Sequence, residues 1–383
     1  MKVAILTFHR AHNYGAVLQC YALYRALSEK GISCDVLDYS PDYFYKMYNI
    51  LPYKHSLKTS IGTYVCHILL RSMLEERVEN FNRFISEYIS LSAKTYNCEE
   101  DLTSIPYDAI IVGSDQVWNN KTALFDPVFF LSTKAFEGKR KYSYAASIGT
   151  DKIPPDLTAE YKNRLQGYRM ISVREESGVS ILKDLLHITP VVSCDPTLLL
   201  NTAMWKQIAG EKPLVEGDYI FLYYVKQPGA IRAYAKALSE KMKCKVICCS
   251  CMFSGGALKK YEFLSGKADR RDGFVTMNSI SPDQFLNLIL YAKFMLCSSF
   301  HATVFSIIFH KQFLSQTVWE GGKTNDRVKN LLAFSGLSDR TTNNSSANIT
   351  DSIDWQSVDQ NIENMRENGL KYLEDISLDL NKA

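Results

Sequence analysis

The sequence lacks a strong charge bias and long hydrophobic runs. Its 44 Lys and Arg residues face 41 Asp and Glu residues, which gives a net charge of +3 over 383 residues. Nucleic-acid-binding proteins usually concentrate basic charge on one face, so this balance argues against a nucleic-acid partner. No stretch approaches the ~20 consecutive apolar residues of a membrane helix. The N-terminal MKVAILTFHR has too short an apolar run for a signal peptide, so we interpret it as a buried strand and expect a cytoplasmic protein.

The sequence also lacks the usual phosphate-binding and metal-binding signatures. It contains neither G-x-G-x-x-G nor G-x-x-x-x-G-K-[ST]. Cys244, Cys248, Cys249 and Cys251 cluster in CKVICCSC, but no second Cys or His pair follows at zinc-ligand spacing. Free cysteine packs as a small hydrophobe, so we predict a buried strand there and expect no metal or other cofactor.

Strand-like and helical segments alternate along the chain. Residues 2–8 resemble a buried strand, 13–31 carry apolar residues at helical spacing, and 34–39 resemble a second strand. This order is the βαβ unit of a parallel, doubly wound sheet. Further strand-like runs in the first half are YDAIIVGSD, KYSYAASIG, MISVREE and PVVSCDPTLLL.

The second half restarts the same pattern. DYIFLYYV and CKVICCSC resemble strands on either side of the helical GAIRAYAKALSEKM. Ser281 and Pro282 suit the N-cap and first position of a helix over SPDQFLNLILYA. We therefore predict an α/β fold with two Rossmann-like domains whose parallel sheets face a central cleft. The predicted divisions are 1–200 with a helical section at about 41–92, 201–350, and a helical tail over 351–383 that packs back on the first domain.

Candidate binding residues follow the predicted strands, because ligands of open α/β sheets bind beyond the carboxyl ends of strands. Asn13, Tyr14 and Gly15 precede a helix, whose free N–H groups and dipole favour an anion. Gly15 could equally serve only a tight turn. After the next strand-like run, backbone amides of Gly113 and Ser114 could contact a ligand. Asp115 could orient a hydroxyl or cap a helix.

Arg174 directly follows the strand-like MISV. An unpaired buried charge is costly, so this arginine needs an anionic partner. Glu175 or Glu176 would be the structural answer. A phosphate or carboxylate of a ligand, held by the planar guanidinium, would be the functional one.

His301 lies in LCSSFHATVFS between a predicted strand and a predicted helix. A lone histidine is more often structural, but this position places it at the cleft. The positive end of a helix favours a neutral imidazole and a bound phosphate favours a protonated one, which suits a proton donor near neutrality. The preceding Ser298 and Ser299 could donate hydrogen bonds to phosphate oxygens.

An ordered set of stretches runs along most of residues 1–340: HNYGAVLQCYALYRAL, YDAIIVGSDQVWN, YSYAASIGT, ISVREESG, CDPTLLL, SSFHATVFSIIF and NDRVKNLLAFSGLSDR. Taken in this order, they resemble the polysaccharide pyruvyltransferase family, and the last resembles the family's C-terminal arginine segment. The resemblance implies a GT-B-like pair of Rossmann-like domains. It also implies transfer of the enolpyruvyl group of phosphoenolpyruvate to a sugar or lipid-linked oligosaccharide, giving a pyruvate ketal and free phosphate.

By this resemblance His301 would be the acid or a phosphate ligand, and Arg174 the anion clamp. Family members can carry arginine two residues before the histidine, where this chain has Ser299. In this chain the positive charge that binds the donor would have to come from Arg327, Arg340 or Arg10. Otherwise the donor would differ from phosphoenolpyruvate.

Two other functions compete with this one. A nucleotide-sugar glycosyltransferase of GT-B architecture would need a carboxylate near the ribose, for which Glu320 is a candidate. The second competing function is that of a non-catalytic sugar-binding protein in the same polysaccharide assembly pathway. The aromatic stretch Tyr43–Tyr53 would suit sugar stacking or peripheral contact with a membrane surface, or simply a helical cover over the first sheet.

Overall fold

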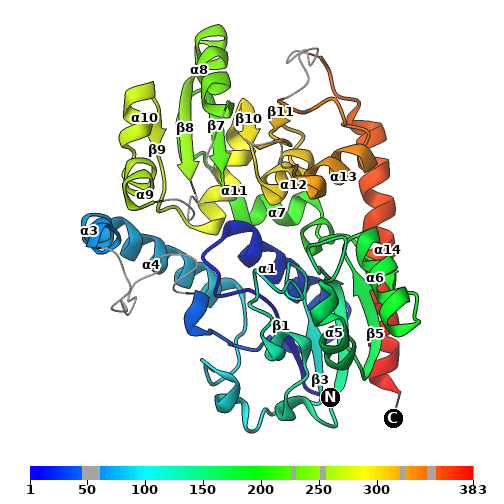
Figure 1. Ribbon diagram of the computed structural model, residues 1–383. Helices are drawn as coiled ribbons and strands as arrows, with labels where there is room; N and C mark the ends of the chain where they lie inside the picture. The colour runs from blue at the N-terminus through cyan, green and yellow to red at the C-terminus, as the bar shows by residue number, and fades with distance from the viewer. Residues whose placement is uncertain (45–60, 226–229, 251–255, 320–323, 343–350, 383) are drawn as a thin grey trace.

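The computed structural model describes residues 1–44, 61–225, 230–250, 256–319, 324–342 and 351–382 of the chain (Figure 1). It contains two parallel sheets, one in each half of the chain, with helices packed around both. The predicted fold class, two Rossmann-like domains with parallel sheets, is confirmed. The predicted divisions at residues 200 and 350 stay predictions, although the first sheet ends at Val192 and the second begins at Tyr219.

The first sheet has the strand order β2-β1-β3-β4-β5-β6, and every neighbouring pair is parallel. All residues of β1 and β3 are buried, as expected for central strands covered on both faces. Its strands are β1 (Val3–Leu6), β2 (Cys34–Val36), β3 (Ala109–Val112), β4 (Arg140–Ala146), β5 (Tyr168–Val173) and β6 (Val191–Val192).

The second sheet has the order β11-β10-β7-β8-β9, again with parallel pairs. Cys248 and Cys249 are fully buried in its strand β8, which confirms their interpretation as strand residues; Cys251 lies outside the described residues. The strands are β7 (Tyr219–Tyr224), β8 (Lys245–Ser250), β9 (Val275–Thr276), β10 (Phe294–Cys297) and β11 (Phe313–Ser315).

The helices confirm the predicted alternation in most places. Ser281 caps α11 and Pro282 opens it, and the Ser281 N–H donates to the Gln284 side chain at 3.0 Å. The helices α9 and α10 and the two-residue β9 carry no clear periodicity and were not predicted. The bounds are α1 (Tyr14–Glu29), α3 (Ile61–Leu69), α4 (Arg71–Tyr88), α5 (Thr158–Arg164), α6 (Glu176–Leu186), α7 (Thr202–Ala209), α8 (Ile231–Met242), α9 (Ala257–Leu264), α10 (Lys267–Asp272), α11 (Pro282–Tyr291), α12 (Phe300–Ile308), α13 (Asp326–Phe334) and α14 (Trp355–Asn381).

The two halves share a packed interface. The Tyr14 ring of α1 stacks on Phe285 of α11 with centroids 4.5 Å apart, and its hydroxyl donates to the Ile280 carbonyl at 3.0 Å. Buried aromatic pairs of this kind add stability beyond their buried area. The interface therefore fixes the first turn of α1 against the second half of the chain.

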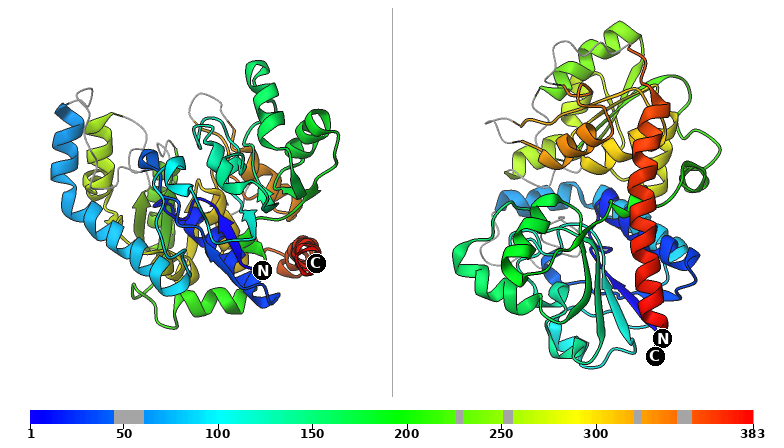
Figure 2. Two further views of the ribbon diagram at one scale, coloured as in Figure 1. Left: turned by 90° about the horizontal axis from the view of Figure 1, so that it is seen from below. Right: turned by 90° about the vertical axis from the view of Figure 1, so that its right-hand side faces the viewer.

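The tail helix α14 runs along both halves, as Figure 2 shows. Its Tyr372 hydroxyl donates to the Ser143 carbonyl of β4 at 3.0 Å. Near its end, Asp379 accepts hydrogen bonds from Arg169 and Tyr142 at 2.6 Å each. A Cβ at Gly369 would lie 2.6 Å from the Tyr144 hydroxyl, so only glycine lets the helix approach the sheet this closely.

The described part of the predicted aromatic stretch packs inside the first half. Phe44 is buried against Phe8, with ring centroids 5.3 Å apart, and the Tyr43 hydroxyl donates to Asp126 at 3.2 Å. Residues 45–53 of that stretch lie outside the described residues. None of the described helices is both long enough and apolar enough to span a bilayer.

Candidate functional site

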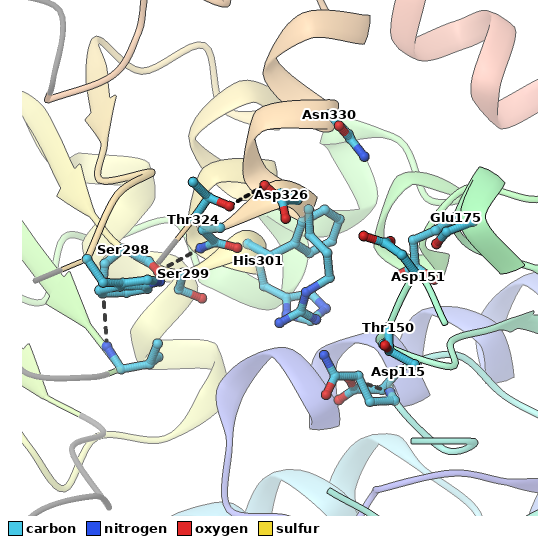
Figure 3. Close-up of a pocket in the computed structure, with 18 of the residues that line it drawn as sticks. Asp115, Thr150, Asp151, Glu175, Ser298, Ser299, His301, Thr324, Asp326 and Asn330 are labelled. Atoms are coloured by element: carbon cyan, nitrogen blue, oxygen red, sulfur yellow. Dashed lines mark hydrogen bonds between the residues drawn. The ribbon is translucent and has the colours of Figure 1, made fainter. Parts of the chain in front are cut away.

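A cavity of about 540 Å³ opens between the two halves, beyond the carboxyl ends of several strands. Figure 3 shows acidic and hydroxyl side chains of the first half on one side of it and Ser298, Ser299 and Thr324 on the other. The lining residues from the first half are Asn13, Asp115, Gln116, Gly149, Thr150, Asp151, Glu175, Glu176 and Ser177. Those from the second half are Val225, Ser298, Ser299, Phe300, His301, Trp319, Thr324, Asn325, Asp326, Arg327 and Asn330.

A buried carboxylate, Asp195, lies behind this cavity where the chain leaves β6. Its Oδ1 accepts hydrogen bonds from the Thr197 hydroxyl at 2.7 Å and the Thr197 N–H at 3.1 Å. Its Oδ2 lies 3.1 Å from Arg174 Nη1 and 3.4 Å from His301 Nε2. Burial raises the pKa of Asp195, but His301, Arg174 and Thr197 outweigh burial and hold the pKa below its ordinary value. Asp195 is therefore an anion that both candidate catalytic side chains share.

His301 stands in the first turn of α12, directly after β10. Its side chain is buried, and Nε2 has no hydrogen-bond partner within the described residues. Asp195 Oδ2 lies 3.4 Å from Nε2, which is close enough for an ion pair but does not form a hydrogen bond. The ring packs edge-on against Phe300, with centroids 5.2 Å apart. A Cβ at Gly15 would lie 2.0 Å from His301 Nδ1, so the bare backbone of α1 makes room for the imidazole.

Arg174 has two carboxylate partners in the structure. Nε donates to Glu175 Oε1 at 2.9 Å and Nη1 donates to Asp195 Oδ2, so Glu175 is indeed a partner. Nη2 is buried and has no partner among the described residues. Burial lowers the pKa of Arg174, but Glu175, Asp195 and Asp115 outweigh it and raise the pKa above its ordinary value. The guanidinium is fixed as a cation with one donor group left over.

Arg327, in the first turn of α13, lines the cavity beside this pair. Its guanidinium carbon lies 6.0 Å from the centroid of the Phe300 ring, and that of Arg174 lies 5.4 Å from the same ring. Arg327 has no hydrogen-bond or ion-pair partner within the described part of the chain. Burial and the charge of Arg174 lower its pKa. A half-buried cation with no anionic partner among the described residues favours an anionic ligand.

The other two arginines considered as sources of charge have partners elsewhere in the structure. Arg10 is held by Asp38, with Nε and Nη2 each 2.7 Å from a carboxylate oxygen. Arg340 is buried, and its Nη2 donates to the Asp351 carbonyl at 2.9 Å. Of the three, only Arg327 lines the cavity.

Four further predicted residues line the cavity: Asn13, Asp115, Ser298 and Ser299. Asn13 caps α1 by accepting from the Gly15 N–H at 3.0 Å. Asp115 has a positive φ of 75°, and its Oδ1 accepts from the Gln116 N–H at 2.8 Å. The Ser298 hydroxyl accepts from the Val225 N–H at 3.4 Å.

Four predicted binding residues do not line the cavity: Tyr14, Gly15, Gly113 and Ser114. Gly15 makes room for the His301 ring. Tyr14 is part of the interface core described above. A Cβ at Gly113 would lie 3.0 Å from Thr7 Cβ, so this glycine lets β1 and β3 approach each other. Ser114 is fully buried, with its hydroxyl 3.5 Å from Asp195 Oδ2. Successive side chains leave the backbone in different directions, so only part of each motif reaches the cavity.

Sequence reasoning missed Asp195 and most of the acidic lining. Asp195 stands in CDPTLLL directly after a strand, and that position was the available signal. Glu320 lies outside the described residues. Within the described residues, no group of three or more His, Cys, Asp or Glu side chains is placed to hold a metal ion. The five carboxylates in the lining are Asp115, Asp151, Glu175, Glu176 and Asp326.

Comparison with known sequences assigns a family. The profile of the polysaccharide pyruvyl transferase family matches residues 13–315, a range that contains Gly15, Arg174, Asp195 and His301. The chain belongs to this family. The predicted resemblance is therefore confirmed. A search of curated protein sequences finds no significant match.

Comparison with solved structures supports the fold of this pyruvyl transferase family member. A UDP-GlcNAc 2-epimerase from Methanocaldococcus jannaschii has a TM-score of 0.50 at 13% identity, with both chains covered completely. An E. coli structure described as trehalose-6-phosphate bound with UDP-2-fluoro glucose has a TM-score of 0.50 at 10% identity, covering 100% of this chain and 99% of the other. At this identity the likeness concerns the fold alone, which is GT-B-like.

Proposed function

We propose that this chain transfers the enolpyruvyl carbons of phosphoenolpyruvate to two hydroxyls of one sugar, giving a pyruvate ketal and free phosphate. The observation that carries the proposal is the guanidinium of Arg327, which has no hydrogen-bond or ion-pair partner among the described residues and lies beside the Arg174–Asp195–His301 group. Phosphoenolpyruvate bears a phosphate and a carboxylate, and planar guanidinium groups bind both. Arg327 thus supplies the charge absent at Ser299.

The reaction requires an acid, and we propose that His301 is that acid, because it lines the cavity next to the carboxylate of Asp195. The proton of the imidazolium is transferred to the methylene carbon of phosphoenolpyruvate, which becomes a methyl group and leaves a cation-like C2. One sugar hydroxyl adds to C2 and loses its proton. A second hydroxyl of the same sugar then displaces phosphate and loses its proton, so two C–O bonds form and one breaks. Asp195, kept ionised, stabilises the charged imidazole before transfer.

The two walls of the cavity suit different parts of this reaction. Arg327 and Ser299 belong to the second half, together with the N-terminus of α12, and this wall favours the anionic donor. Asp115, Asp151 and Glu175 belong to the first half, and their carboxylates can accept hydrogen bonds from sugar hydroxyls. We infer that the acceptor sugar, free or lipid-linked, lies against the first half.

Phosphate release tests the proposal. The protein is incubated with phosphoenolpyruvate and a panel of sugars and oligosaccharides, and products are analysed for a mass gain of one pyruvate less one water. We expect phosphate release that depends on a sugar and is abolished in His301→Gln. His310→Gln is the matched control, because His310 is half-exposed and pairs with Asp359 at 2.8 Å. Consumption of UDP-sugars with no reaction of phosphoenolpyruvate would instead support a nucleotide-sugar glycosyltransferase.

A further inference from the structure

Helix α3 presents apolar side chains to solvent. Ile61, Val65, Ile68 and Leu69 recur at helical spacing and are all exposed, Ile68 to 55% and Leu69 to 58%. Tyr64 of the same helix is also exposed. Such a stripe normally faces the core of a protein. When it faces solvent, it marks a surface that binds another protein or a membrane.

A second helix, from the other half of the chain, extends this surface. Cys66 of α3 packs against Leu264 of α9, as does Leu70, which lies between α3 and α4. A Cβ at Gly62 would lie 3.5 Å from Ala257 Cβ, so the two helices are in close contact. Beside Ala257, Leu258 is 85% exposed. Figures 1 and 2 both place α3 next to α9 at one edge of the molecule. We call Ile61, Tyr64, Val65, Ile68, Leu69 and Leu258 the apolar face.

A basic groove adjoins the apolar face on α9 and α10. It has a volume of about 570 Å³ and is lined by Leu258, Tyr261, Glu262, Lys267, Arg270 and Arg271. Arg271 pairs with Glu262, whereas Lys267 lies 4.7 Å from the Tyr261 ring and Arg270 donates to the Ser265 carbonyl. Neither Lys267 nor Arg270 has a carboxylate partner among the described residues. The groove thus keeps a positive charge next to the exposed Leu258 of the apolar face.

We propose that the apolar face and the basic groove together dock this protein on the surface of an anionic lipid bilayer. Apolar side chains enter the boundary between headgroups and acyl chains, and flanking Lys and Arg contact lipid phosphates. Charge complementarity selects lipid over a protein partner, because the cations flank the apolar side chains as they do in interfacial helices. The docking surface joins both halves of the chain, so binding holds them in one arrangement.

The docking helices connect directly to the candidate site. Helix α4 follows α3 and carries Arg77, whose Nη2 donates to the His12 carbonyl at 3.4 Å. His12 directly precedes Asn13, which lines the cavity. A membrane-bound protein would therefore hold its cavity at a fixed height above the lipid. The docking does not depend on which donor or acceptor the cavity takes.

Vesicle sedimentation of the full chain tests this proposal. Vesicles of phosphatidylcholine with phosphatidylglycerol are compared with vesicles of phosphatidylcholine alone. We expect binding to the anionic vesicles that weakens with salt, and roughly fivefold weaker binding for each charge removed in Lys267→Gln and Arg270→Gln. Ile68→Asp is expected to weaken binding about tenfold or more. The matched control is Leu378→Asp on α14, because Leu378 is 57% exposed and lies away from this surface.

Each alternative occupant has a distinct outcome. Equal effects of Ile68→Asp and Leu378→Asp would overturn the proposal, as would binding that ignores lipid charge. Self-association in solution that Ile68→Asp abolishes, with no vesicle binding by the parent chain, would assign the apolar face to a second copy instead. Thermal unfolding of every variant confirms that the fold is intact before binding is compared.

Discussion

Gly15 and His301 approach so closely that a Cβ at position 15 would lie 2.0 Å from the imidazole Nδ1. Gly15 belongs to the first turn of α1 and His301 to the first turn of α12, so the contact joins the two halves of the chain at the cavity. The position of the imidazole thus depends on bare backbone from the other half. Gly15 leaves the space that the imidazole occupies.

Gly15→Ala is expected to displace the imidazole and reduce turnover about a hundredfold, because small misplacements of reacting groups have effects of that size. Sugar-dependent phosphate release measures it. Gly62→Ala is the control, since its Cβ would make an ordinary 3.5 Å contact with Ala257 and alanine favours the helix. Wild-type turnover in Gly15→Ala would show that the position of His301 is not critical.

Asp195→Asn preserves the shape of the side chain and removes its charge. Because the carboxylate accepts from Arg174 Nη1 and lies 3.4 Å from His301 Nε2, we expect turnover to fall about a hundredfold. A purely structural Asp195 would lower the free energy of unfolding and leave the turnover of the folded protein unchanged. Turnover per folded molecule, with the folded fraction taken from denaturant unfolding, therefore separates a positioning role from a packing role.

The sequence predicted the fold better than the site. Buried runs such as VAIL and AIIV identify strands by themselves, and Ser281-Pro282 marks a helix start, because these signals are local. The two-residue strand β9 has no such signal, since its pairing with β8 depends on the rest of the sheet.

The site depends on contacts that sequence spacing does not record. Asp195 meets Arg174 and His301 only where the ends of β5, β6 and β10 converge. Arg10 and Arg327 were both considered from the sequence, but Arg10 has Asp38 as a buried partner, and Arg327 has no carboxylate partner among the described residues. Long-range pairing decides which arginine is left for a ligand.

Arg327→Gln is expected to weaken phosphoenolpyruvate binding about 10- to 100-fold, the effect of losing charge-assisted hydrogen bonds. The Michaelis constant for phosphoenolpyruvate should rise more than turnover falls. Lys329→Gln on the same helix removes one charge outside the cavity lining and is expected to leave both constants unchanged. Equal behaviour of the two variants would mean that Arg327 does not contact the donor.

The hydrogen bonds to Asp379 of the tail helix α14 predict that the stability of the fold depends on pH. Hydrogen bonds from Arg169 and Tyr142 lower the pKa of Asp379 to about 2. A lowered carboxyl pKa stabilises the fold above the unfolded-state value and loses this effect as pH falls through the folded-state value. Asp379→Asn should therefore cost about 1 kcal/mol of unfolding free energy at neutral pH, and the difference should vanish between about pH 4 and pH 2. Denaturant unfolding across this range measures it, and a difference independent of pH would exclude the ionised carboxylate as its cause.

Titration calorimetry of the purified protein with phosphoenolpyruvate, and separately with UDP-GlcNAc, tests the identity of the donor most directly. We expect saturable binding of phosphoenolpyruvate that Arg327→Gln weakens and Lys329→Gln does not, and no binding of UDP-GlcNAc. Saturable binding of UDP-GlcNAc with no heat from phosphoenolpyruvate would contradict a pyruvyl donor at His301, Arg174 and Arg327.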